Sequence, residues 1–138
     1  MSTAIDTLKA AQEKAAAIRP KVGGFPYLAE VLRQAGVSRY HYTVPAATSL
    51  FLTSAGPVIA QGSPILDGMA DVAPWDGEAV ITAIRTDQAG ESTYPQFAQA
   101  CWTAGIVRYE VDLSARTCTY YGATGEQYVE SYPHVDIP

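Results

Sequence analysis

The segment Phe25–Tyr42, FPYLAEVLRQAGVSRYHY, decides how this chain folds, because a second version of it follows 69 residues later. The later version, Tyr94–Val111, reads YPQFAQACWTAGIVRYEV. The alignment runs without a gap from residues 25–56 to residues 94–125, and nine of these 32 positions are identical. Ordinary residue abundances would give about two matches. We therefore predict that the chain contains an internal duplication.

Each copy of the segment has the pattern of a helix followed by a strand. Pro26 suits a first helical turn, and Gly36 stands where the apolar stripe of that helix ends. From Val37 the period of the apolar residues changes to two, which indicates a half-buried strand. Two more short strands, separated by turn residues, complete each half.

A further helix precedes each copy. Apolar residues at spacings of three and four predict a first helix that ends at Ile18, with Thr3 and Asp6 as a capping box. Asp76 can cap the corresponding helix of the second half, which Gly90 ends. Each half is thus predicted to run helix, helix, strand, strand, strand.

The predicted fold class is α+β, with about four helices packed on one side of antiparallel sheet and pseudo-two-fold symmetry between the halves. We expect a single domain over residues 1–138, with pseudo-repeats at about 3–61 and 76–132 and a connector at about 62–75. Three strands and two helices are marginal alone, so the halves should share one core. The pattern leaves open whether the sheet is six-stranded or split.

Composition excludes several classes of function. The net charge is −5 and no run of Lys or Arg forms a basic patch, so we do not expect a nucleic-acid partner. No stretch is long and apolar enough to cross a bilayer, and the first residues do not form a signal peptide, so we expect a cytoplasmic protein with no membrane partner. We interpret Cys101 and Cys118 as buried thiols, and expect no metal site and no cofactor.

The repeated motif Ala-Gly-x-x-Arg-Tyr supplies the candidate ligand-binding residues. It places Arg39 and Arg108 at equivalent positions on the strand face opposite Tyr40 and Tyr109. The polar face continues with the candidates His41 and Glu110, beside Thr43 and Asp112. Two interpretations remain open: a cleft in which the arginines bind an acid while His41 moves a proton, or cross-strand ion pairs on a solvated sheet face.

Three segments also carry a resemblance to a known family. They are Ala17–Glu30 (AIRPKVGGFPYLAE), Thr86–Gly90 (TDQAG), and Thr119–Gly122 (TYYG) with Gly125–Glu126. With these segments the chain resembles the YbcV-like family of small bacterial proteins of unknown function, some carried on prophages and some labelled phage envelope proteins. The resemblance implies no activity, so no catalytic residue is carried over.

These observations favour a soluble binding or interaction module over an enzyme. Its partner would be an unknown protein or small molecule, met by the open sheet face or the connector, and a homodimer is one form of this role. Two alternatives stay open. One is a small enzyme that binds an anionic or polar metabolite with Arg39, Arg108, His41 and Glu110; the other is a prophage accessory protein that acts on a host protein.

Overall fold

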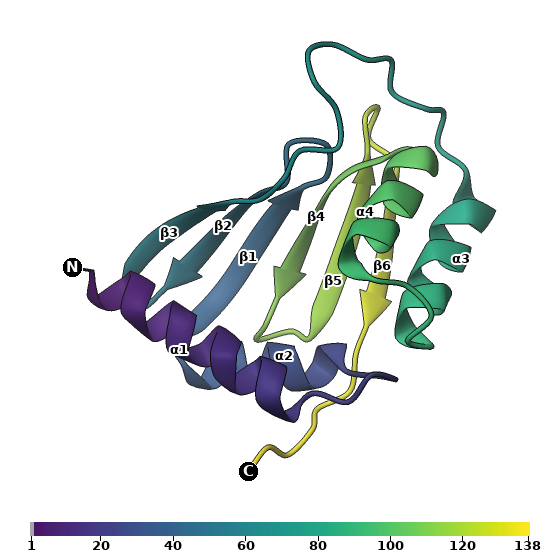
Figure 1. Cartoon of the computed structure of the whole chain (residues 1–138). Helices are drawn as coiled ribbons and strands as arrows, with labels where there is room; N and C mark the ends of the chain where they lie inside the picture. Colours follow the sequence, from purple (N-terminus) through teal and green to yellow (C-terminus); the bar gives the residue numbers. More distant parts are fainter. Residues whose placement is uncertain (1) are drawn as a thin grey trace.

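The computed structural model of the chain describes residues 2–138. It contains four helices and six strands in the order α-α-β-β-β-α-α-β-β-β (Figure 1). The elements of the first half are α1 (Thr3–Ile18), α2 (Phe25–Gln34), β1 (Val37–Thr43), β2 (Thr48–Thr53) and β3 (Gly56–Gln61). Those of the second half are α3 (Gly77–Gln88), α4 (Tyr94–Thr103), β4 (Ile106–Asp112), β5 (Thr117–Gly122) and β6 (Gln127–Ser131).

The strands form one six-stranded sheet in the order β3-β2-β1-β4-β5-β6, and every neighbouring pair is antiparallel. The predicted α+β class is therefore confirmed, and of the two sheet arrangements left open the six-stranded one is present. The halves meet at the centre, where β1 pairs with β4 and Tyr42 lies opposite Tyr109. The connector, residues 62–76, crosses from the edge strand β3 to α3 (Figure 1).

Three of the four described helices begin at side-chain caps, whereas α2 follows Gly24 without one, and the cap at Asp76 is the one that the sequence predicted. Asp76 accepts a hydrogen bond from the N–H of Ala79 at the start of α3, and Thr93 forms a capping box with Gln96 at the start of α4. At the start of α1 the cap is Ser2 rather than Thr3, because it is the Ser2 hydroxyl that accepts from the N–H of Ile5. The first helix thus begins one residue earlier than the predicted capping box implied.

Backbone geometry repeats at equivalent positions of the two halves. Gly36 and Gly105 both have positive φ, at 97° and 92°. The only non-glycine residues with positive φ among those described, Ala47 and Arg116, are also 69 positions apart. Irregular register occurs at the start of β1 and again at the start of β4. The halves therefore share local backbone features; their origin as copies of one unit stays a prediction.

The helices lie on one face of the sheet, with α1 packed on α2 over the first half and α3 packed on α4 over the second (Figure 1). This inner face carries the core: Tyr40, Phe51, Val58, Val111 and Cys118 lie in one cross-strand row and are all buried. The opposite face is uncovered and carries the alternating polar side chains. In residues 2–138 no helix has the length and apolar character that a membrane crossing requires.

Candidate functional site

A cleft of about 780 Å³ opens between the two helix pairs, above the inner face of the sheet. This volume falls in the range of small-molecule sites in proteins. Apart from the sheet, the walls come from four places: the loop after α1 with the start of α2, the end of α3, the start of α4, and the chain after β6. We call this the central cleft.

The floor of the central cleft is aromatic. Tyr42, Tyr109, Tyr120 and Tyr128 stand opposite one another across β1, β4, β5 and β6. Of this row, Tyr109 and Tyr120 line the cleft, together with Tyr40 from the neighbouring row. Period-two alternation places all of them on the inner face, as the sequence predicted for Tyr40 and Tyr109. The result is a broad, rigid surface of tyrosine rings.

Two loops close one end of the central cleft and are tied together. The N–H of Gly23 donates to the carbonyl of Gln88 at 2.9 Å, which joins the loop after α1 to the end of α3. Gly90 is required at this junction, because its φ is 72° and a Cβ there would lie 2.8 Å from the carbonyl oxygen of Lys21. The loops therefore hold the ends of the helix pairs at a fixed separation.

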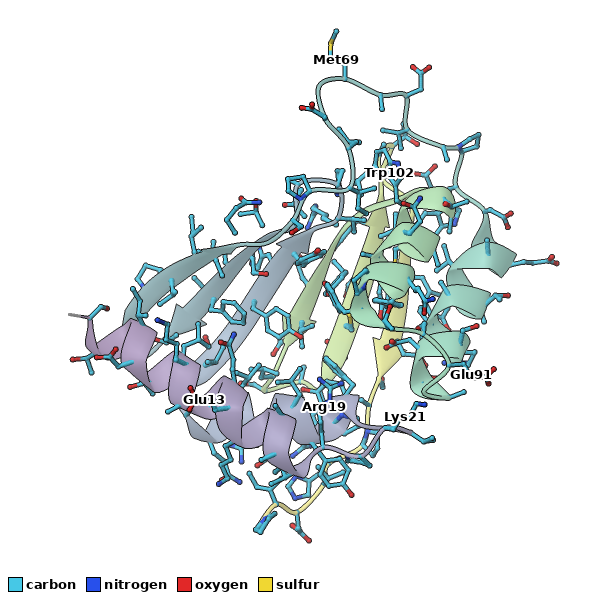
Figure 2. All side chains as sticks on the ribbon, viewed as in Figure 1. Glu13, Arg19, Lys21, Met69, Glu91 and Trp102 are labelled. Atoms are coloured by element: carbon cyan, nitrogen blue, oxygen red, sulfur yellow. The ribbon has the colours of Figure 1, made fainter. Side chains whose placement is uncertain are left out.

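Arg19 stands out among the charged residues of this region. It follows the last residue of α1 and lines the central cleft, in the gap between the helix pairs that Figure 2 shows. Arg33, Arg39, Arg85 and Arg108 are each ion-paired with a carboxylate. Among residues 2–138, no ion pair holds Arg19. Its guanidinium is thus available to a bound molecule.

Two carboxylates face the central cleft and differ in their surroundings. Burial raises the pKa of Asp87, while a hydrogen bond from Ser92 and the charge of Arg19 act in the opposite direction. Glu130 lies on the inner face of the edge strand and accepts from Arg85, Tyr128 and Gln88. Burial opposes ionisation of Glu130, but the hydrogen bonds from Arg85 and Tyr128 prevail and lower its pKa. Glu130 is therefore engaged by the α3 side chains Arg85 and Gln88, whereas Asp87 accepts a hydrogen bond from Ser92.

The nucleophilic side chains of the central cleft are poorly placed for catalysis. Burial raises the pKa of the Cys118 thiol to about 12, and it does the same for Cys101, which lies outside the cleft on the buried side of α4. A thiol with such a pKa stays protonated at neutral pH and is a weak nucleophile. No histidine lines the cleft, and in residues 2–138 no three His, Cys, Asp or Glu side chains gather as a metal site would require.

The chain after β6 borders the central cleft and is anchored to α2. His134 Nδ1 lies 3.8 Å from Glu30 Oε1, and Glu30 itself is only 5% exposed. Arg33 donates two hydrogen bonds to Glu30, at 3.0 and 2.6 Å, and Gln34 donates a third at 2.9 Å. These contacts, led by the hydrogen bond from Arg33, lower the pKa of Glu30 to about 2.

The Glu30 cluster predicts a loss of stability in acid. A carboxyl whose folded pKa is lowered stabilises the fold fully above its unfolded pKa, near 4.5, and loses that contribution as the pH falls towards 2. The shift corresponds to at most about 3 kcal/mol, which we reduce to about 2 kcal/mol because Arg33 is half exposed and screened. Urea unfolding at pH 6 and pH 2.5 measures this loss. Between these two pH values, the free energy of unfolding of Glu30→Gln should fall by about 2 kcal/mol less than that of the unmodified chain. Glu13→Gln, at an exposed site on α1, is the control; a variant at Glu30 with the full acid loss would contradict the assignment.

The sequence-predicted candidates lie on the opposite, uncovered face and only partly converge. His41 Nε2 is 3.2 Å from Glu110 Oε1, and Arg108 Nη1 is 3.5 Å from Glu110 Oε2. Arg39 instead pairs with Asp112 across β1 and β4, at 3.1 Å. The structure therefore brings together His41, Arg108 and Glu110, and places Arg39 in a separate ion pair.

The environment of Glu110 is that of an ion-pair network. Burial favours the neutral acid, but the hydrogen bond from Tyr121 and the charges of His41 and Arg108 together lower its pKa. The guanidinium of Arg108 lies 3.8 Å above the ring of Tyr121, a cation–π contact. A small hollow of about 190 Å³ lies nearby, lined by Arg39, Glu110, Asp112, Thr117, Thr119 and Tyr121.

Sequence reasoning missed the central cleft, although it named many of the residues around it. Arg19, Gly23 and Phe25 lie in the first of the three segments that carry the family resemblance, Asp87 in the second and Tyr120 in the third. The common location of these segments was the available signal.

Comparison with known proteins identifies the family but assigns no activity. The chain is 49% identical over 136 residues to the uncharacterized protein Rv2012 of Mycobacterium tuberculosis strain H37Rv, an alignment that covers 99% of this chain and 83% of that protein. It has the same identity and coverage with the uncharacterized protein Mb2035 of Mycobacterium bovis. Residues 13–131 match the family model described as "Protein of unknown function (DUF1398)". The chain therefore belongs to the DUF1398 family.

Proposed function

We propose that the protein is a binding module that holds a small, largely apolar molecule in the central cleft. The observation that carries this proposal is the cleft itself: about 780 Å³ of space between two helix pairs, floored by the rings of Tyr40, Tyr109 and Tyr120. Apolar concave sites with a few polar groups are the usual form of small-molecule sites. Tyrosine rings add to this because they bind flat or branched apolar groups with little loss of side-chain entropy.

The chemistry of the central cleft supports binding rather than turnover. Its thiol is protonated, it has no histidine, and Glu130 is engaged by Arg85. Asp87 is the remaining group that could exchange a proton, and its nearest hydroxyl partner, Ser92, already donates to it at 3.2 Å. A site with this inventory can orient a molecule, and its thiol is not activated as a nucleophile.

Binding of N-phenyl-1-naphthylamine, a neutral apolar dye, tests the proposal. The dye becomes fluorescent in apolar sites, so a titration with direct excitation of the dye gives its Kd. We expect one saturable site, because the cleft buries a molecule of that size. Leu28 lines the cleft, and Leu28→Trp should weaken binding about tenfold or more by filling it.

The matched control is Leu52→Trp, which adds the same side chain to the uncovered sheet face. Leu52 lies opposite Arg39 on that face, so this variant should bind the dye as the unmodified chain does. Circular dichroism and thermal unfolding confirm that both variants fold. The proposal fails if the dye does not bind, or if both tryptophan variants bind it equally well.

A second candidate function, self-association through the uncovered sheet face, is favoured by exposed apolar side chains at both edges of that face. Ile59 on β3 is 69% exposed and Val129 on β6 is 54% exposed, and they end the same cross-strand row. Exposed apolar groups on an open sheet suit a protein contact. Light scattering after size-exclusion chromatography should then show a dimer that Ile59→Glu converts to monomer; a monomer at all concentrations contradicts it.

The candidates of the uncovered face and the prophage link have less support. Arg39, His41, Arg108 and Glu110 remain a proposal for an acid-binding site, but each arginine already has a carboxylate partner that a ligand would have to displace. A role as a prophage accessory protein rests on the family resemblance alone. The proposal for the central cleft rests on neither.

A further inference from the structure

We infer that the molecule held in the central cleft carries one acidic group, which Arg19 and Tyr40 bind while its apolar body covers the tyrosine floor. This inference rests on the proposed binding function and specifies its ligand class: a small amphipathic acid, such as an aromatic or aliphatic carboxylate, sulfonate or phosphate. Nothing in the sequence pattern had placed Arg19 or Tyr40 in a site. Neither side chain has a hydrogen-bond or ion-pair partner among residues 2–138.

Arg19 provides a positive charge that no group of residues 2–138 neutralises by direct contact. Of the other arginines, Arg33 and Arg85 are bound by Glu30 and Glu130, and Arg116 contacts His134. Arg19 lies close enough to Tyr40 and Asp87 to influence both, yet within residues 2–138 it forms neither an ion pair nor a side-chain hydrogen bond. A guanidinium with five donors at the edge of an apolar site is suited to bind an acid, often through two parallel hydrogen bonds.

Tyr40 provides a buried donor that is aimed into the same space. Its side chain is 8% exposed and lines the central cleft. Among residues 2–138, every side-chain oxygen that is sealed from solvent has a hydrogen-bond partner. The Tyr40 hydroxyl has no such partner among these residues, so its oxygen is not sealed and opens on the cleft. Burial raises the pKa of Tyr40, which keeps the hydroxyl protonated and able to donate.

Contrast with Tyr109 strengthens this assignment. The Tyr109 hydroxyl also lies beneath the helices, but it is 2.8 Å from the Tyr94 hydroxyl and is satisfied by it. The ring of Tyr40 stacks on that of Phe51, with centroids 5.1 Å apart, and its hydroxyl has no polar partner in the part of the chain that the structure describes. The Tyr40 hydroxyl is therefore free to donate a hydrogen bond to an acceptor bound in the cleft.

The remaining charges at the cleft decide between an acidic and a basic ligand. Lys21 stands in the same loop as Arg19, and its side chain contacts the Gly90 turn at the end of α3 (Figure 2). The negative charges at the cleft are those of Asp87 and Glu130, and Glu130 is paired with Arg85. Burial raises the pKa of Asp87, which weakens its hold on a cation. The balance favours an anion beside Arg19.

Two dyes with the same body test the inference directly. 8-Anilinonaphthalene-1-sulfonate is N-phenyl-1-naphthylamine with one added sulfonate, so the ratio of their affinities isolates the acidic group. We expect the sulfonate dye to bind the unmodified chain about tenfold tighter than the neutral dye, as a charge-assisted contact would give. Added sodium chloride should weaken only the sulfonate dye. This comparison needs no variant.

Three variants locate the anion. Arg19→Gln should raise the Kd of the sulfonate dye about tenfold and change the Kd of the neutral dye by less than about twofold. Tyr40→Phe should raise the Kd of the sulfonate dye severalfold. It should leave the affinity for the neutral dye as in the unmodified chain, because only the hydroxyl is removed. Asp87→Asn should strengthen the sulfonate dye by removing a nearby negative charge. Arg39→Gln, on the far face of the sheet, should leave both affinities unchanged.

The outcomes separate this inference from the binding proposal. If neither dye binds, the proposed function fails. If the neutral dye binds and the sulfonate dye is no tighter, or if Arg19→Gln weakens both dyes equally, the cleft binds an apolar molecule without an acid site and the inference fails alone. Weaker sulfonate binding in Asp87→Asn would also overturn it, since that result would assign the polar contact to Asp87.

Discussion

Gly105→Ala should destabilise the protein by about 3 kcal/mol or more, a loss of roughly 10 °C in Tm. Gly105 ends α4 with φ at 92°, a conformation that costs an alanine about 1 to 2 kcal/mol. A Cβ would also lie 2.8 Å from both the Pro74 carbonyl oxygen and the Trp75 Cα. These are backbone atoms of the connector, which cannot move away without breaking the hydrogen bond from Asp76 to Ala104.

The equivalent glycine of the first half is the control. Gly36 has nearly the same φ, 97°, but a Cβ there would meet the hydroxyl oxygen of Ser54, at 2.5 Å. A serine side chain can rotate, so Gly36→Ala should cost about 1 to 2 kcal/mol, mostly from the dihedral angle. Urea unfolding of both variants gives the difference. Equal losses would show that the connector does not press on the end of α4.

Leu32→Ala should be nearly as damaging, with a loss of about 3 kcal/mol in the free energy of unfolding. Leu32 is 2% exposed and is among the largest fully buried side chains of the protein. Its truncation removes three carbon atoms from the packing of α2 on the rest of the core. Because α1, α2 and the sheet are held by many other contacts, the cavity should remain partly open rather than collapse.

The residue 69 positions later, Cys101, provides the comparison. It is fully buried on α4 at the place that corresponds to Leu32 on α2. Cys101→Ala removes a single sulfur atom, so we expect a loss of about 1 kcal/mol. Chemical denaturation measured by circular dichroism would compare the two. A loss at Leu32 no greater than the loss at Cys101 would mean that the first helix pair contributes little to the core.

Much of the fold followed from local patterns. The alternation around Arg39 and Tyr40 predicted which strand face is buried, and the glycines and caps predicted where the helices begin and end. The position of one strand beside another is a different problem. The partner of Arg39 is Asp112, 73 residues away, and that choice depends on how β1 and β4 align, which no local signal specifies.

The central cleft could not be predicted for a related reason. Tyr40 has the burial of a core residue, and a sequence pattern cannot distinguish a tyrosine packed against a helix from one that floors an open space. The distinction depends on the separation of two helix pairs. That separation is set by loops around Gly23 and Gly90, whose contact links distant parts of the chain.

The central pairing of β1 with β4 also bears on synthesis. All other strand pairs are hairpins, which can form within a short stretch of chain. The β1–β4 pair can form only after the second half has been translated. During that interval β1 is a bare edge, and the rings of Tyr40 and Tyr42 lack the neighbours that bury them in the finished molecule. The nascent first half is therefore the form most exposed to wrong pairing with other chains, and the arrival of β4 ends that risk.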